Sequence, residues 1–202
     1  MQPEIEVRFL GVDYAALRHA LKTAGATLQQ PMHAMRRVII DYPDQRLQHG
    51  TDGMWSILRL RDEGERVVLT YKQIAKNAGK DTHEIETEVS SYDNTLAILR
   101  QVGLDVISEQ HTRREAWRLG ECDVTLDEWP WLPPLVELEG PGEDVLQSVA
   151  ETLGLDWSKL IRGNAVDAYQ QVYPGMSEDS IRNTPLLTFD TMPDWLKERQ
   201  QA

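Results

Sequence analysis

The sequence predicts an α+β fold in which eight antiparallel strands form a barrel with helices on its outside. Charged residues occupy every second position in several short segments, the first of which is Glu4-Ile5-Glu6-Val7-Arg8. Side chains alternate between the two faces of a strand, so each segment has one charged and one apolar face. Short turns such as Asp62-Glu63-Gly64-Glu65 join neighbouring segments, which is typical of antiparallel hairpins. Helices over the apolar faces would leave the charged faces lining the inside of a closed barrel.

The strands are predicted from alternation and from β-branched and apolar residues. They are residues 3–10, 35–42, 54–62, 66–73, 82–89, 109–119, 121–128 and 135–140. Apolar residues at helical spacing predict helices at residues 12–24, 92–102, 143–153 and 164–173. Asp13 is suited to cap the first of these helices, and Gly25 to end it.

The composition changes after Pro174-Gly175, where Ser, Asp, Asn, Thr and further prolines become frequent. We therefore predict one domain over residues 1–175 and a C-terminal extension over residues 176–202. Trp195 and Leu196 provide apolar side chains with which the extension would dock on the domain. A poorly ordered tail is the alternative, and the sequence does not decide between the two.

The overall charge excludes some classes of partner. A formal net charge of -12 argues against nucleic acid or an anionic membrane as a general partner. No apolar run approaches the ~20 residues that span a bilayer. The first residues also lack the apolar region of a signal peptide, which predicts a cytoplasmic protein. The sequence leaves monomer and homodimer open.

Three carboxylates share one strand face at Glu84, Glu86 and Glu88. Like charges at this spacing repel each other unless cations lie between them. A flat sheet with a solvated charged face is the simpler interpretation of any one such segment. Six segments in which the charged residues are mostly Glu and Arg favour a barrel that binds a cation and an anion together.

The same segments resemble the CYTH superfamily, also called triphosphate tunnel metalloenzymes, over roughly residues 3–173. Glu4-x-Glu6-x-Arg8 is similar to the family signature Glu-x-Glu-x-Lys, and Ile39-Ile40-Asp41-Tyr42-Pro43-Asp44 to its Tyr-Phe-Asp-Thr-Pro-Asp segment. Four further segments match later strands of the family in order: residues 58–61, 69–72, 126–128 and 136–139. The resemblance implies an eight-stranded antiparallel tunnel that binds a triphosphate and a divalent metal.

The residue types then suggest roles. Carboxylates are the oxygen ligands that Mg²⁺ or Mn²⁺ prefers, and the candidate metal ligands are Glu4, Glu6, Asp127, Glu137 and Glu139. Basic side chains suit phosphate oxygens, and the candidate triphosphate ligands are Arg8, Arg37, Arg59, Arg61, Lys72 and Arg113. We expect Glu4, Glu6, Arg8 and Lys72 to be catalytic. Glu84, Glu86 and Glu88 would support them by orienting basic residues or positioning water.

Two assignments depend on strand register. Arg36 and Arg114 are adjacent to Arg37 and Arg113, and would face inward in their place if the register moved by one residue. Arg8 stands where the family more often has Lys. Residues 129–134, Trp-Pro-Trp-Leu-Pro-Pro, replace a Gly-containing turn of the family. We interpret them as a rigid apolar segment between two strands.

The leading functional hypothesis is metal-dependent hydrolysis of a triphosphate, with inorganic tripolyphosphate as the preferred substrate. No Gly-rich phosphate loop or nucleoside-binding motif accompanies the charged strands. Class IV adenylyl cyclase, which makes cyclic AMP from ATP, and thiamine triphosphatase are alternatives in the same family. A module that binds a polyphosphate or nucleotide without turnover is the alternative from another class.

Overall fold

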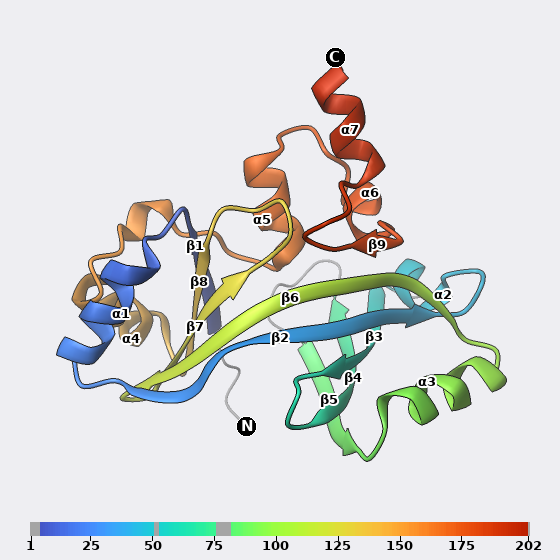
Figure 1. The fold of residues 1–202 in the computed structure, drawn as a ribbon, viewed down its shortest axis with the longest axis horizontal. Helices are drawn as coiled ribbons and strands as arrows, with labels where there is room; N and C mark the ends of the chain where they lie inside the picture. Colours follow the sequence, from blue (N-terminus) through green and yellow to red (C-terminus); the bar gives the residue numbers. More distant parts are fainter. Residues whose placement is uncertain (1–4, 51–52, 76–81, 202) are drawn as a thin grey trace. The chain divides into compact units, whose positions relative to one another are not determined.

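The computed structural model describes residues 5–50, 53–75 and 82–201, and the chain divides into two compact units. The first unit comprises residues 1–33 and 112–182, and the second comprises residues 34–111 and 183–202. Two long strands, β2 (Thr27–Asp41) and β6 (Asp105–Leu119), belong to both units (Figure 1). They are neighbours in the hydrogen-bonded strand order.

The first unit contains three further strands and most of the helices. Its elements are β1 (Ile5–Leu10), α1 (Tyr14–Thr23), β7 (Cys122–Glu128), β8 (Leu135–Gly140), α4 (Glu143–Thr152), the 3₁₀ helix η1 (Trp157–Lys159), α5 (Ala165–Val172) and α6 (Glu178–Arg182). The strand order is β1-β8-β7-β6, and each pairing is antiparallel.

The second unit is built on three antiparallel strands that continue the order from β2. Its elements are α2 (Arg46–His49), β3 (Met54–Asp62), β4 (Val67–Ala75), β5 (Thr82–Val89), α3 (Tyr92–Gln101), β9 (Leu186–Leu187) and α7 (Asp194–Gln201). The pairings β2-β3, β3-β4 and β4-β5 are antiparallel, whereas the short β9 runs parallel to β6.

The core of the first unit lies on the apolar face of its strands. Val7 of β1 and Leu138 of β8 are buried there, together with Leu17 of α1 and Leu146 of α4. Figure 1 shows α1 and α4 beside β1, β7 and β8. Asp13 caps α1, since its Oδ1 accepts a hydrogen bond from the backbone nitrogen of Ala15 at 2.8 Å. The alternating residues of these strands therefore place apolar side chains on the face covered by the helices and charged side chains on the opposite face.

The second unit repeats this arrangement with α3. Val38 and Ile40 of β2 and Leu60 of β3 are buried against Tyr92 and Leu104, at the two ends of the α3 region. Ser91 caps α3, because its hydroxyl accepts a hydrogen bond from the backbone nitrogen of Asn94. The charged residues of β2, β3 and β4 are thereby directed to the opposite face.

The predicted α+β class, with eight antiparallel strands and flanking helices, is confirmed. Two strands begin earlier than predicted, β2 at Thr27 and β6 at Asp105. The C-terminal extension contains α6, β9 and α7, and it buries Ile181, Leu187 and Leu196. None of the helices in the described part of the chain has the length and hydrophobicity needed to span a bilayer.

A partly buried ion pair joins α1 to β6 within the first unit. Arg18 donates through Nε and Nη2 to the carboxylate of Glu115, at 3.0 and 2.9 Å, and Trp117 Nε1 donates to the same carboxylate at 2.7 Å. Burial acts to raise the pKa of Glu115, but the hydrogen bonds from Arg18 and Trp117 outweigh it and lower this pKa below its ordinary value. The ionised carboxylate therefore stabilises the folded state.

We predict that Glu115→Gln lowers the free energy of unfolding by about 1–3 kcal/mol at neutral pH, because the hydrogen bonds from Arg18 and Trp117 to a charged group are weakened. A lowered folded-state pKa gives stability that is present above the unfolded-state pKa and is lost as the pH falls through the folded-state pKa. Urea unfolding from neutral to strongly acidic pH should therefore show the parent and the variant converging. The exposed Glu121→Gln is the control, with an effect within about 0.5 kcal/mol. A difference that stays constant with pH would contradict the assignment.

Candidate functional site

Three carboxylates converge on the charged face of the first unit. Glu6 lies opposite Glu139 in the β1-β8 pairing, and Glu137 lies opposite Arg8 two residues away. Directly paired residues project to the same face, so all three carboxylates point the same way. One carboxylate oxygen from each of Glu6, Glu137 and Glu139 lies within 4.8 Å of the others. This group is called the carboxylate cluster below.

The guanidinium of Arg8 lies among these carboxylates. Its Nη1 and Nη2 are 3.3 and 3.2 Å from the two carboxylate oxygens of Glu6, and Nη2 also pairs with Glu137. Nη1 donates in addition to the backbone oxygen of Gly163. Burial acts to lower the pKa of Arg8, but the charges of Glu137 and Glu6 outweigh it and raise this pKa. Arg8 is therefore a permanent cation and does not act as a base.

A second guanidinium reaches the same face from β6. Arg114 lies opposite Asp127 and binds both of its carboxylate oxygens, at 2.6 Å through Nε and 2.5 Å through Nη2. Its Nη2 also lies 3.6 Å from Glu137. Burial opposes the charge of Arg114, yet the carboxylates of Asp127 and Glu137 raise its pKa. Arg114 thus neutralises two acidic groups that are themselves almost fully buried.

These contacts separate the predicted metal ligands into three groups. Glu6, Glu137 and Glu139 come together in the carboxylate cluster. Asp127 is held by Arg114 instead. Glu4 lies outside the described residues.

The register also changes which arginine of β6 faces the carboxylates. Arg113 lies opposite Glu128 and donates to it at 2.8 Å, on the opposite face of β6 from Arg114 and Asp127. Its side chain is half exposed. Arg114 therefore occupies the position predicted for Arg113. The adjacent arginines at positions 113 and 114 indicate in the sequence that one of them faces the carboxylates. Only the β6-β7 register shows that this residue is Arg114.

The predicted basic residues of the second unit share one face. Arg37 lies opposite Arg61, and Arg59 follows two residues before Arg61 on β3. Arg59 lies opposite Thr70 of β4, and Lys72 is two residues further along β4. Because every second residue of a strand has the same orientation, all four basic side chains project to this face.

Carboxylates accompany these basic side chains. Glu84 lies opposite Lys72, and the two side chains are 3.4 Å apart. Glu86 accepts a hydrogen bond from Thr70 at 3.2 Å. The Nη2 of Arg61 is 2.5 Å from Glu63, a partner that the sequence pattern did not indicate. The alternation of charge predicted for β3, β4 and β5 thus gives a mixed acidic and basic surface within the second unit.

Two tyrosine hydroxyls hold residues 129–134, between β7 and β8, and a third holds the strands on either side. Tyr14 donates to the backbone oxygen of Asp127 in β7 at 2.6 Å, before this segment begins. Tyr169 of α5 donates to the oxygen of Pro130, and Tyr173 donates to that of Trp131. Trp131 has a positive φ of 63°, which is costly for an aromatic residue. The tyrosines therefore fix the connection between the strands that present Asp127 and Glu137.

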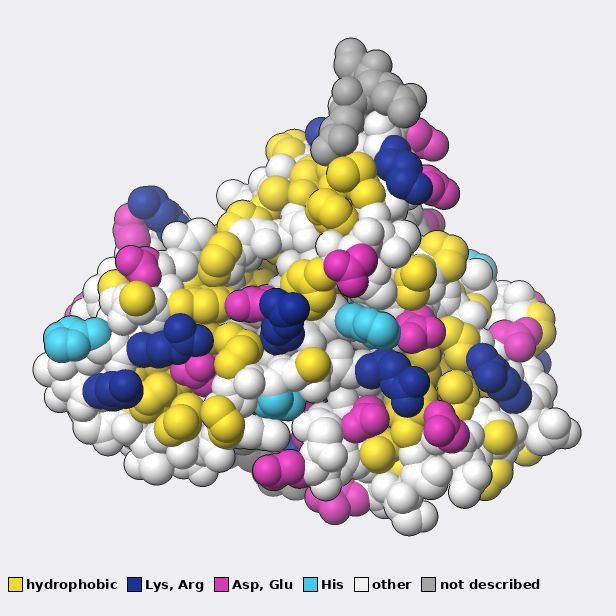
Figure 2. All heavy atoms as spheres, viewed as in Figure 1, with side chains coloured by type: hydrophobic (Ala, Val, Ile, Leu, Met, Phe, Trp, Pro, Cys, Tyr) yellow, Lys and Arg dark blue, Asp and Glu magenta, His cyan; other side chains and the backbone are white. Residues whose placement is uncertain are grey.

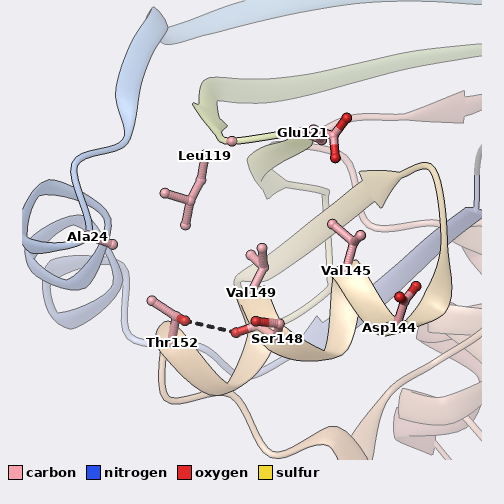
Figure 3. Close-up of a pocket in the computed structure, with 9 residues that line it drawn as sticks. Ala24, Leu119, Glu121, Asp144, Val145, Ser148, Val149 and Thr152 are labelled. Atoms are coloured by element: carbon pink, nitrogen blue, oxygen red, sulfur yellow. Dashed lines mark hydrogen bonds between the residues drawn. The ribbon is translucent and has the colours of Figure 1, made fainter.

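A cavity of about 590 Å³ lies elsewhere in the first unit (Figure 3). Leu119, Val145 and Val149 give it an apolar wall, and Glu121 and Asp144 add negative charge. The residues that line it include neither Lys nor Arg. This cavity therefore does not suit a polyanion. Figure 2 shows basic and acidic side chains interspersed on the face in view.

We predict different stability effects for the two adjacent arginines of β6. Arg114→Ala leaves Asp127 and Glu137 without their cation and should destabilise the fold by about 3–5 kcal/mol. Arg113→Ala breaks an exposed pair and should change stability by no more than about 1 kcal/mol. Urea unfolding without added metal measures both. Equal effects would show that the β6 register is wrong.

Comparison with curated proteins found no match. Several solved structures are similar in fold. A protein of Pyrococcus horikoshii has a TM-score of 0.64 at 20% sequence identity, over 82% of this chain and 98% of its own. A candidate adenylate cyclase of Vibrio parahaemolyticus has a TM-score of 0.65 at 16% identity, over 85% of this chain and 98% of its own. A candidate adenylyl cyclase of Hippeastrum, described as having a dominant triphosphatase activity, has a TM-score of 0.56 at 16% identity, over 95% of this chain and 100% of its own.

The sequence match agrees with these structures. The model of the CYTH domain matches residues 2–162, which include the carboxylate cluster, Arg8 and Arg114. The motifs from which the resemblance was inferred therefore lie within the matched region. The chain belongs to the CYTH domain family.

Proposed function

We propose that this protein is a metal-dependent triphosphatase whose preferred substrate is inorganic tripolyphosphate. The observation that supports the proposal most directly is the carboxylate cluster, with oxygens of Glu6, Glu137 and Glu139 within 4.8 Å of one another. The buried guanidinium of Arg8 and the partly buried guanidinium of Arg114 share its face. Carboxylates for a cation beside arginines for phosphate oxygens are what phosphoryl transfer chiefly requires.

The residues fit a hard divalent cation. All three groups of the cluster offer carboxylate oxygens, and Glu6 and Glu139 are only partly buried. This donor set suits Mg²⁺ or Mn²⁺, because both prefer oxygen ligands and retain sites for water and phosphate. When bound, such a cation supplies charge neutralisation for the phosphate oxygens. We propose Glu6, Glu137 and Glu139 as its ligands and retain Glu4 as a further one.

The chain's own cations bind and orient the phosphates. Arg8 and Arg114 are held by carboxylates from two sides, so their positions are set before the substrate arrives. We propose both as phosphate ligands, with Arg114 in the role predicted for Arg113. Asp127 then acts by orienting Arg114 through its two hydrogen bonds.

The second unit contributes further basic residues to the proposal. Arg37, Arg59, Arg61 and Lys72 are proposed phosphate ligands, supported by their common strand face. Glu84 is suited to orient Lys72, its partner at 3.4 Å. We extend the same supporting role to Glu86 and Glu88, which follow on the same face of β5.

A substrate panel tests the function. Purified protein is assayed with tripolyphosphate, ATP, thiamine triphosphate and long-chain polyphosphate, each with Mg²⁺ and with Mn²⁺. Released phosphate and cyclic AMP are both measured. We expect phosphate release to be fastest from tripolyphosphate. If cyclic AMP from ATP is the main product, the protein is a cyclase and the proposed hydrolysis is wrong. If substrates bind without any turnover, the protein is a binding module.

The carboxylate cluster gives a sharper prediction. Glu6→Gln and Glu139→Gln each remove one anionic ligand, so Mn²⁺ binding measured calorimetrically without substrate should weaken. Turnover at limiting Mg²⁺ should fall about 100-fold or more, by analogy with the loss of one preorganised electrostatic group. Both variants should stay folded, because one of several mutually repelling carboxylates is removed. Glu121→Gln, an exposed glutamate in the same unit, is the matched control. Unchanged Mn²⁺ affinity in both cluster variants would refute the metal site.

A further inference from the structure

A buried row of hydrogen bonds in the second unit connects the C-terminal segment to Arg37. Ser108 donates through its hydroxyl to the backbone oxygen of Thr184 at 2.6 Å. Gln110 Nε2 donates to the Ser108 hydroxyl at 3.1 Å, and Arg37 Nε donates to Gln110 Oε1 at 2.8 Å. All four residues are buried, Ser108 completely. We call Thr184, Ser108 and Gln110 the relay.

The order of donors and acceptors determines how the Gln110 amide is oriented. A serine hydroxyl has one proton, which Ser108 gives to the Thr184 oxygen, so its oxygen is left to accept from the Gln110 amide nitrogen. The amide oxygen of Gln110 therefore points to Arg37. Rotating the amide by 180° would bring an NH₂ group against the Arg37 Nε–H and leave a buried donor without an acceptor, which is costly.

The anchor of the relay is itself held firmly. The backbone nitrogen of Glu109 donates to the oxygen of Pro185 at 2.9 Å, and Glu109 and Gln110 of β6 pair in parallel with the two residues of β9. Trp195 Nε1 donates to the Thr184 hydroxyl at 3.0 Å. The apolar Leu187 is buried beside this pairing. All the C-terminal residues involved lie beyond residues 2–162, the part of the chain that matches the family.

We propose that Ser108 and Gln110 are positioning residues that fix the Nε edge of Arg37, and that the C-terminal segment supplies their anchor through the Thr184 backbone oxygen. The inference rests on the proposed function, since Arg37 is taken there as a phosphate ligand. A guanidinium oriented in advance loses less conformational entropy when it binds phosphate. The effect should therefore appear mainly in KM for the triphosphate.

The first experiment removes the middle hydroxyl. Ser108→Ala takes away the acceptor that orients the Gln110 amide, so we expect KM for tripolyphosphate with saturating Mg²⁺ to rise about fivefold, with kcat changed less. Ser56→Ala is the matched control, because Ser56 is a buried serine of the same unit whose hydroxyl bonds Tyr71 outside the relay. We expect its KM to equal that of the parent.

The second experiment separates positioning from packing. Gln110→Glu keeps an oxygen acceptor for Arg37 Nε, whereas Gln110→Met keeps the length of the side chain and removes the acceptor. Gln110→Met should raise KM for tripolyphosphate at least as much as Ser108→Ala does. Gln110→Glu should have a KM close to that of the parent protein. Equal KM values for the Glu and Met variants would overturn the proposal.

A spectroscopic readout distinguishes a failed relay from a failed function. The Arg37 Nε–H signal in ¹H–¹⁵N spectra, assigned by its absence in Arg37→Lys, should shift in Ser108→Ala and in Gln110→Met and stay in place in Ser56→Ala. This measurement needs no substrate. An unmoved signal in both relay variants overturns the proposal whether or not the chain hydrolyses triphosphates. If the signal shifts in both relay variants but the parent protein turns over no triphosphate, the proposed function is overturned, and with it the phosphate role of the relay.

Discussion

Charge compensation on one sheet face is the constraint on which the first unit depends. The β1-β8 pairing places the carboxylates of Glu6, Glu137 and Glu139 within 4.8 Å of one another. Such a group is unfavourable without cations, because like charges at this distance repel strongly where water is partly excluded. Arg8 and Arg114 supply two cations from the same face. The opposite face is left mainly apolar, and α1 and α4 pack against it. Glu115 is a charged exception on that face and is paired with Arg18 of α1.

Local alternation was sufficient to predict the faces, because a period of two depends only on neighbours along the chain. Arg37, Arg59, Arg61 and Lys72 accordingly share the face that the sequence predicts. Local alternation did not decide which of Arg113 and Arg114 lies on the face of the carboxylates. Both are chemically equal in the sequence, and only the pairing of β6 with β7 decides which one meets Asp127.

The C-terminal extension shows a different limit of sequence reasoning. β9 is two residues long and pairs with β6 across more than seventy intervening residues. A strand this short has no local sequence pattern from which it could be predicted. The hydrogen-bond partner of Ser108 is a backbone oxygen, which every residue type provides. Ser108 lies before the predicted start of β6, and the link from Ser108 and Gln110 to Arg37 forms only when β2 and residues 184–187 are both in place. Polar networks assembled from distant segments are therefore the part of a site that composition and spacing miss.

In the proposed function, the divalent cation and the triphosphate both depend on the carboxylates that bind Arg8. Its guanidinium binds Glu6 and Glu137, two of the three members of the carboxylate cluster. A divalent cation bound at the cluster would be attracted by the same carboxylates. It would therefore weaken the electrostatic attraction between these carboxylates and Arg8. In the proposed complex, phosphate oxygens would replace the interactions that Arg8 loses, and the guanidinium would in turn favour phosphate binding. Under the proposed function we therefore expect metal and triphosphate to bind with positive coupling, in which case each raises the affinity for the other by the same factor.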